Sequence, residues 1–318
     1  MNIMENKPTI FAVWICKPGT YMMPLLYEVC IASWQVLNRN FNTVVYTNNP
    51  ELKFNLLSRD TTEVRLLEDY IPGVLQDAEE MTKDTPEGMK FAHQSDYVRY
   101  NLLANLDRAI YIDCDLLCIS SIEELVNNCI EANKFILEAN EDSMRICNAF
   151  FGKLDREADD YFTDLILNYN DNYVKTSYTF NSIKYPMLLN LRYRDIVKIL
   201  PFKGGCFYPN WEKNENGDLG LLTCEEMPDS IMGYGIHLYN TDIKWKDLRY
   251  KLEKNMYDVN PVWWISRHCK NVIDDYIRMM TESQLRDISG DSILKNNLTV
   301  LYGTSYVEKL GKEGKKNG

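Results

Sequence analysis

The sequence has few histidines and lacks the glycine motifs that usually bind nucleotides. Its 318 residues include three histidines, His93, His237 and His268. A histidine-rich metal site is thereby excluded, and any metal must be held mainly by oxygen ligands. Neither a GxGxxG nor a GxxxxGK[ST] motif is present. The glycine-rich loops that bind phosphate in dinucleotide-binding and P-loop proteins are therefore missing, which argues against both classes. A bound phosphate would need another source of positive charge.

Long apolar runs and paired cysteines are also lacking. No apolar run is long enough to span a bilayer, and the start MNIMENKPTI has no hydrophobic signal core. The nine cysteines include no CxxC pair, which argues against a zinc ribbon and against a disulfide framework. We therefore expect reduced cysteines in a cytoplasmic protein. Contact with the inner face of a membrane would be peripheral, through the lysines near residue 318.

Positive charge is scarce. The chain has 35 Lys and Arg against 46 Asp and Glu, a formal net charge of −11. Nucleic acid is therefore not an expected partner, because phosphate backbones need clustered cations. A phosphorylated ligand would have to recruit cations locally.

Apolar runs alternate with helical spacings along the chain. Strands are predicted over residues 9–16, 42–46, 63–67, 108–113, 135–138 and 233–239. Helices are predicted over residues 24–37, 95–106, 122–129 and 155–169, with Ser95 as an N-cap and a loop over 82–88. This order predicts an α/β fold in which helices flank a mostly parallel sheet. We expect one catalytic domain over 1–245 and a helical extension with a basic tail over 246–318.

Two carboxylates follow one of the predicted buried strands. Asp113 and Asp115 end the strand over 108–113 and precede another apolar run over 116–119. Two carboxylates so placed can turn toward one cation at the carboxyl edge of the sheet, where open α/β sheets bind ligands. Mg²⁺ and Mn²⁺ take oxygen ligands and bridge carboxylates to substrate phosphates. The pair predicts a divalent-cation site, and the alternative is a capped turn.

A second polar pair lies upstream on a predicted helix. Asp96 and Arg99 are three residues apart, so they can converge on one ligand or pair with each other. The carboxylate can accept from sugar hydroxyls, and the guanidinium offers a planar fork of donors to a phosphate.

These residues carry a resemblance to a known family. SDYVRYNLLANLDRAIYIDCDLL, residues 95–117, resembles the SDxxRxxxLxxxGGxYxDxD signature of glycosyltransferase family 32. Arg108 and Ala109 replace its Gly-Gly, and in this the segment is closer to family 8. Residues 9–48 loosely resemble the opening of those enzymes, and GIHLYNTDIKW, residues 235–245, resembles the His and Lys-Trp ending of family 8.

The resemblance implies a GT-A fold and a metal-dependent, retaining transfer of a sugar. The donor would be a nucleotide-sugar, UDP-linked, and the acceptor a glycan in cell-surface polysaccharide or lipopolysaccharide assembly. The nucleotide-sugar half would cover about 1–120, and the acceptor half about 121–245. Alternatives are a toxin-like transferase that modifies a protein and a non-catalytic nucleotide-sugar-binding module.

The resemblance also implies roles for single residues. Asp113, Asp115 and Arg99 would be catalytic, and Asp113, Asp115 and His237 would hold Mn²⁺ or Mg²⁺. The donor-binding set would be Val13, Trp14, Asp96, Arg99, Tyr111, Asp113, Cys114, Lys244 and Trp245. Asn148 is added to this set on chemical grounds, because its amide can hydrogen-bond a donor hydroxyl. For Trp14 and His237, which lie in apolar strands, packing in the core is the alternative.

Overall fold

The computed structural model of the chain describes residues 7–17, 19–23, 25–54, 57, 62–118, 120–140, 146–177, 184–201, 205–207 and 233–237. Lys244 and Trp245, two of the expected donor-binding residues, lie outside these ranges, as does the expected helical extension over 246–318. The division of the chain at residue 245 therefore stays a prediction.

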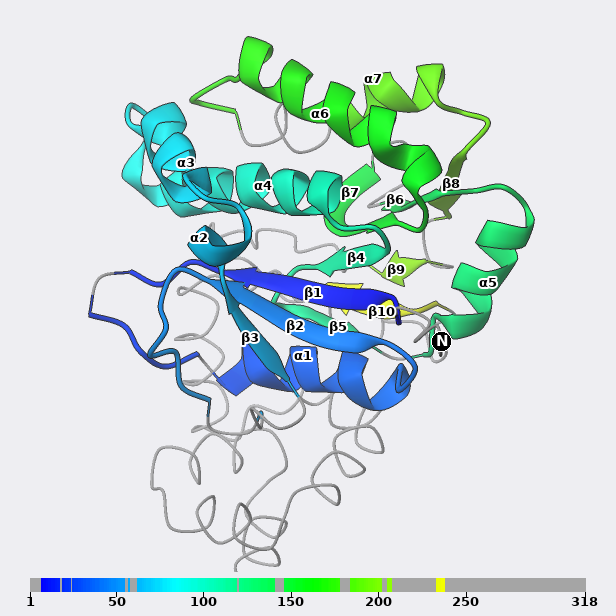
Figure 1. Ribbon diagram of the computed structural model, residues 1–318, viewed down its shortest axis with the longest axis horizontal. Coiled ribbons are helices and arrows are strands. Elements are labelled where there is room, and N and C mark those ends of the chain that lie inside the picture. The colour runs from blue at the N-terminus through cyan, green and yellow to red at the C-terminus, as the bar shows by residue number, and fades with distance from the viewer. Residues whose placement is uncertain are drawn as a thin grey trace, which may run out of the picture.

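Most of the described strands form one sheet of seven strands, in the order β3-β2-β1-β4-β7-β6-β8 (Figure 1). The strands are β1 (Thr9–Trp14), β2 (Asn42–Thr47), β3 (Glu63–Leu66), β4 (Ala109–Ile112), β6 (Ile136–Asn140), β7 (Ile146–Lys153) and β8 (Val197–Leu200). All neighbouring pairs are parallel except the two that β7 makes with β4 and β6. The expected mostly parallel α/β sheet is confirmed.

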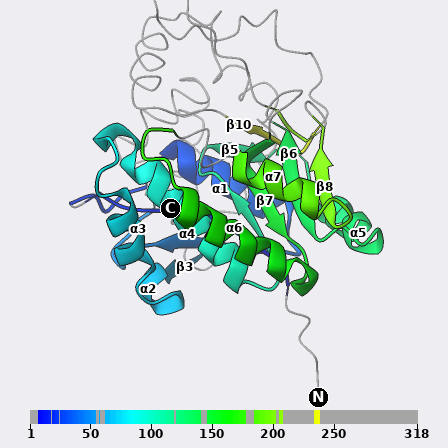
Figure 2. The same cartoon turned by 90° about the horizontal axis from the view of Figure 1, so that it is seen from above.

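Helices cover both faces of this sheet (Figures 1 and 2). One face carries α1 (Leu25–Leu37), and the other carries α3 (Val74–Thr82), α4 (Glu87–Asn105), α6 (Asp159–Asn172) and α7 (Tyr185–Arg192). Shorter elements are α2 (Leu67–Tyr70), α5 (Glu123–Glu131) and the 3₁₀ turn η1 (Arg156–Ala158). Among the described residues, no helix combines the length and the apolar character needed to cross a membrane.

The apolar run of β1 is continuous because both of its faces are covered. Ile10 and Ala12 belong to the buried cluster on the α1 side, which also contains Trp34. Phe11 belongs to the cluster on the α4 side, together with Leu102. Successive side chains of a strand point to opposite faces, so a strand in the middle of a two-sided core needs apolar residues at every position.

Helix α4 begins earlier than the sequence pattern indicates. It starts at Glu87, so Ser95 lies inside the helix and the N-cap expectation was wrong. The loop expected over 82–88 is correspondingly shorter. The first turns of α4 are held by tertiary contacts: Gln94 is buried, and its amide donates to the Thr82 hydroxyl at 3.1 Å. Such contacts with α3 are invisible to a local pattern, which also missed α3, α7 and β8.

A small second sheet joins distant parts of the chain. Its order is β5 (Leu116–Cys118), β10 (Gly235–His237) and β9 (Cys206–Phe207). β10 runs antiparallel to β5, and their register sets His237 opposite Leu116. Leu116 directly follows Asp115, so this pairing carries a late segment of the chain to the end of β4.

Candidate metal centre

Asp113 and Asp115 lie in a tight turn at the carboxyl end of β4. The Asp113 amide donates to the Ala149 carbonyl of β7 at 2.8 Å, which extends the ladder by one residue. The Leu116 amide donates back to the Asp113 carbonyl at 2.9 Å and closes the turn. Both carboxylates are therefore held on a rigid backbone at the edge of the sheet where the sequence predicts them.

His237 completes a group of three ligand residues at this edge. Its Nε2 lies 3.1 Å from Asp115 Oδ1 and 3.4 Å from Asp113 Oδ2. One ligand atom from each of the three residues lies within 4.8 Å of the others. Two carboxylates and one imidazole suit a hard or borderline divalent cation such as Mg²⁺ or Mn²⁺. The three residues thus form a group that can hold a metal ion.

The charges of this group depend on one another. Burial lowers the pKa of His237, but Asp115 and Asp113 outweigh burial and raise it to about 10. Burial raises the pKa of Asp113, but the Arg99 charge and the His237 hydrogen bond outweigh it and hold that pKa at about 2. The carboxylates therefore attract positive charge strongly, and a divalent cation would take the place of the imidazole proton.

Arg99 lies behind the carboxylates and is 3% exposed. Its guanidinium is 3.1 Å from Asp113 Oδ1 and 3.2 Å from Asp96 Oδ1. It also stacks on the Tyr111 ring, at 4.2 Å from the ring centre, and donates to the Asn148 carbonyl at 3.0 Å. Arg99 therefore pairs with Asp96, as the alternative interpretation of the sequence had it, and with Asp113 as well.

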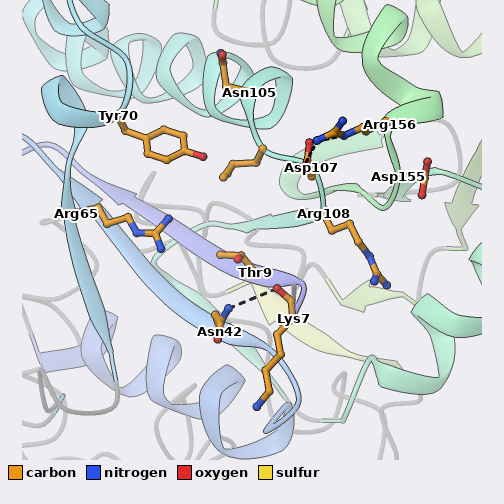
Figure 3. A pocket seen from close by; sticks show the side chains of 11 residues that line it. Lys7, Thr9, Asn42, Arg65, Tyr70, Asn105, Asp107, Arg108, Asp155 and Arg156 are labelled. Carbon is orange, nitrogen blue, oxygen red and sulfur yellow. Dashed lines mark hydrogen bonds and ion pairs between the residues drawn. The ribbon is translucent and has the colours of Figure 1, made fainter. Parts of the chain in front are cut away.

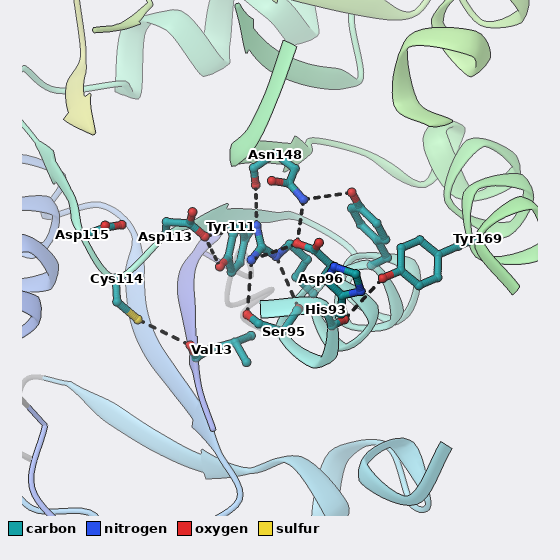
Figure 4. Close-up of polar contacts among 12 residues, drawn as sticks. Val13, His93, Ser95, Asp96, Tyr111, Asp113, Cys114, Asp115, Asn148 and Tyr169 are labelled. Atoms are coloured by element: carbon teal, nitrogen blue, oxygen red, sulfur yellow. Dashed lines mark hydrogen bonds and ion pairs between the residues drawn. The ribbon is translucent and has the colours of Figure 1, made fainter. Parts of the chain in front are cut away.

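The Arg99 guanidinium is surrounded by a buried polar layer that includes Asp96, Tyr111 and Asn148. Figure 4 labels these three residues. The Asn148 amide donates to Asp96 Oδ1 at 2.8 Å and to the Tyr100 hydroxyl at 3.1 Å, and the Tyr111 hydroxyl donates to Asp113. Burial raises the pKa of Asp96 to about 6, although the Arg99 charge opposes this. Asp96 Oδ2 has no hydrogen-bond partner within the described part of the chain. Of the expected donor-binding residues, Asp96, Tyr111 and Asn148 thus lie in this layer.

Val13 and Trp14 end β1 beside the same turn, and Cys114 lies within the turn. The Cys114 thiol donates to the Val13 carbonyl at 3.4 Å, which ties β1 to the carboxylate turn. Trp14 is half-buried and its ring lies 5.0 Å from that of Tyr27, centre to centre. The indole Nε1 is buried and finds no partner among the described residues. Trp14 therefore combines a packed ring with a free donor at the edge that carries Asp113.

A pocket that the sequence did not predict opens next to these residues. It measures about 460 Å³ and lies at the carboxyl ends of β1 and β2 and against the first turns of α4. Lys17, Asn48, Phe91 and Gln94 line it, and the Lys17 ammonium lies 5.3 Å from the centre of the Phe91 ring. The polar Asn48-Asn49 that follows β2 was the available signal, since loops at this edge collect ligands.

Comparison with known proteins gives likeness in structure only. No protein-family model and no curated protein matches the sequence. The fold is similar to PaToxG glycosyltransferase (13% identity, 58% of this chain and 68% of that one, TM-score 0.41). It is similar to mouse xyloside xylosyltransferase 1 (9% identity, 63% of this chain and 87% of that one, TM-score 0.43). It is also similar to galactosyltransferase LgtC with donor and acceptor sugar analogues (10% identity, 72% of this chain and 87% of that one, TM-score 0.40). Since all three TM-scores are below 0.5, these likenesses decide nothing about this chain's function.

Proposed function

We propose that this protein is a metal-dependent glycosyltransferase with the GT-A fold. It would move a hexose from a UDP-sugar to a glycan acceptor, with retention at the anomeric carbon. The observation that carries the proposal is the group Asp113, Asp115 and His237 at the carboxyl edge of a mostly parallel sheet. Retention, the UDP-hexose donor and a role in cell-surface polysaccharide or lipopolysaccharide assembly rest on the resemblance of residues 95–117 to family 32 and family 8.

The three residues would hold Mn²⁺ or Mg²⁺, which when bound stabilises the negative charge that develops on the departing diphosphate. Arg99 assists from the protein side, because its charge keeps Asp113 ionised at neutral pH. Tyr111 orients the same carboxylate by donating to it. In a chain of net charge −11, such local cations are needed to bind a diphosphate.

The donor would lie across two adjoining places at one edge of the sheet. The pocket of about 460 Å³ has the size of a small-molecule site and offers an aromatic face at Phe91 and a cation at Lys17. A nucleoside there would set its phosphates toward the carboxylate turn, past Trp14. The acceptor would then bind beside the sugar of the donor. The reaction would take place in the cytoplasm, at the inner face of a membrane.

The test is the release of nucleoside diphosphate from a panel of UDP-, GDP- and ADP-sugars, with Mn²⁺, with Mg²⁺ and with EDTA. We expect release from a UDP-hexose that EDTA abolishes, and a loss of 100-fold or more in Asp113→Asn and in Asp115→Asn. Asp195→Asn is the matched control, because the Asp195 side chain is 94% exposed. Asp195 also lies just before β8, at the edge of the sheet opposite the metal centre.

Far-UV circular dichroism of each variant separates loss of chemistry from loss of fold. Full activity in EDTA, or in either carboxylate variant, would contradict the proposal. Binding of UDP-hexose without turnover for any acceptor tested would instead favour the non-catalytic binding module.

A further inference from the structure

A larger pocket lies at the opposite edge of the main sheet (Figure 3). It measures about 680 Å³ and is formed at the amino ends of β1, β2 and β4, between α2 and the end of α4. Thr9 and Asn42 are the first residues of β1 and β2, and Arg108 directly precedes β4. The carboxylate turn at Asp113 is at the other end of β4, so this pocket is separate from the proposed donor site.

Cations gather in this pocket although the chain as a whole is acidic. Lys7, Arg65, Arg108 and Arg156 line it, against two carboxylates, Asp107 and Asp155. Arg156 is held by Asp107 through two hydrogen bonds of 2.8 and 2.7 Å, and Arg65 is held by Glu63 through two of 2.7 and 2.9 Å.

Lys7 and Arg108 make no ion pair with any residue of the described part of the chain. Two cations of the lining are therefore without a carboxylate partner among the described residues. A ligand with an acidic group would satisfy them.

The aromatic ring of Tyr70 forms one wall of the pocket, and neighbouring side chains hold it in place. Tyr70 is 38% exposed, and its ring lies 5.4 Å from the Tyr46 ring and 5.9 Å from the Arg65 guanidinium. Figure 3 shows Tyr70 and Arg65 on one side of the pocket and the Arg156–Asp107 pair on the other. A ring fixed in this way presents its apolar face without an entropic cost on binding.

Planar polar groups form another part of the wall. Asn42 and Asn105 are exposed residues of the lining. Their amides donate to the Lys7 carbonyl at 3.5 Å and to the Asn101 carbonyl at 2.8 Å, which leaves each amide oxygen and one N–H for a ligand. The Arg156–Asp107 pair offers donors and an acceptor side by side. Groups with paired donors and acceptors match the neighbouring hydroxyls of a sugar ring, and an exposed aromatic face packs on its C–H groups.

We infer that this pocket binds a saccharide unit that carries an acidic group. The sugar ring packs on Tyr70 and bonds to Asn42, Asn105 and the Arg156–Asp107 pair, and the acidic group is held by Arg108 and Lys7. The volume lies within the roughly 300–1,000 Å³ of small-molecule sites. The choice of a saccharide rests on the proposed function, under which the pocket would anchor a remote part of an anionic glycan.

The test measures binding by isothermal titration of the full chain. The probes are a disaccharide of glucuronic acid and N-acetylglucosamine, N-acetyllactosamine as its neutral match, UDP, and inorganic phosphate. We expect the acidic disaccharide to bind at least tenfold more tightly than the neutral one. Arg108→Ala and Tyr70→Ala should each weaken that binding about tenfold or more, and Arg194→Ala, an exposed arginine elsewhere, should not.

Asp113→Asn separates this inference from the proposed function, because it removes a ligand of the proposed metal and leaves the second pocket intact. Binding of the acidic disaccharide by Asp113→Asn as tight as by the wild type supports the inference even if no transfer is detected. The inference is overturned if neither disaccharide binds, or if Arg108→Ala binds the acidic disaccharide as tightly as the wild type. It is also overturned if phosphate or UDP binds as tightly as the acidic disaccharide and Arg108→Ala weakens that binding equally.

Discussion

The guanidinium of Arg99 lies between two carboxylates, Asp96 and Asp113, and is almost completely buried. Burying a charge is costly unless it is paired and hydrogen-bonded, and here the Asn148 carbonyl and the Tyr111 ring supply the remaining contacts. Arg99 thus holds Asp113 in position, and its fork spans two carboxylates at once. A lysine keeps the charge but not the fork.

We therefore predict that Arg99→Lys weakens the binding of Mn²⁺ by on the order of 10–100-fold, the loss typical when a partner of a metal ligand is removed. Calorimetric titration of Mn²⁺ measures this. Arg192→Lys is the control, because Arg192 also pairs with an aspartate, Asp164, but at the surface. Equal affinity in Arg99→Lys and wild type would mean that the orientation of Asp113 does not depend on Arg99.

Glu138 of β6 is a second buried carboxyl group, away from the metal centre. It is 2% exposed and accepts hydrogen bonds from the Tyr161 hydroxyl, at 2.7 Å, and from the Asn190 amide. Burial raises the pKa of Glu138 from 4.5 to about 7, although both hydrogen bonds oppose this. Because the pKa is higher in the folded state, its contribution to stability is complete below about pH 4.5 and is lost as the pH rises through 7.

We predict that Glu138→Gln removes this pH dependence. Between pH 5 and pH 8 the wild type should lose on the order of 3 kcal/mol of unfolding free energy relative to the variant. Urea denaturation at both pH values measures the difference. Asp96 titrates in the wild type and in the variant alike, so its contribution cancels in the difference between their unfolding free energies. Glu157→Gln is the control: Glu157 is exposed, so this variant should show the pH dependence of the wild type. Parallel pH profiles of Glu138→Gln and wild type would contradict the assignment.

Strand β7 is the only described strand of the main sheet that runs against its neighbours, and it packs tightly between them. At Gly152 an added Cβ would lie 3.2 Å from Leu137 Cβ and 3.2 Å from Ile110 Cγ1. Leu137 and Ile110 belong to β6 and β4, which flank β7. The Leu137 Cβ is attached to the backbone of a paired strand and cannot move without moving that strand.

Gly152→Ala is accordingly predicted to destabilise the fold by about 1–3 kcal/mol, the usual cost of overpacking a core. This loss should appear in the free energy of unfolding at constant m-value, since the compactness of the folded state is unchanged. A stability gain, as expected where alanine merely reduces the freedom of the unfolded chain, would show that the three strands can separate at this point.

The proposed metal centre joins two segments that are far apart in the sequence. Asp113 and Asp115 end β4, and His237 ends β10, which reaches them only by pairing with β5. A site made from both segments exists only in the folded chain, so the free energy of binding a cation there adds to the stability of the whole molecule.

Mn²⁺ is therefore predicted to stabilise the wild type, by about 2.7 kcal/mol at 100 times its Kd. His237→Ala should lower the Mn²⁺ affinity on the order of 10–100-fold and reduce the rise in Tm at a fixed Mn²⁺ concentration. His93→Ala is the control, because His93 is also buried but contacts Tyr173 instead. An undiminished rise in Tm for His237→Ala would show that His237 packs in the core without binding metal.

Local patterns were sufficient for the parts of the fold that neighbouring residues determine. β1, β2 and β4 follow from short apolar runs, and α1 follows from the helical spacing of its apolar residues, so neighbouring residues are enough to predict them. The positions of Asp113 and Asp115 follow from the same strand, because they are its next residues. Boundaries were harder, as α4 shows, since its first turns depend on contacts with α3.

What the sequence determined by itself is thus the alternation of strands and helices and the place of the two carboxylates at a strand end. Only the tertiary structure decided what surrounds them. It set His237 opposite Leu116, placed Arg99 between Asp96 and Asp113, and inserted β7 antiparallel into the sheet. It also created the cationic pocket at the far edge. The physical reason is that side-chain periodicity is a property of neighbouring residues, whereas strand pairing and ion pairing depend on how the whole chain buries its apolar surface.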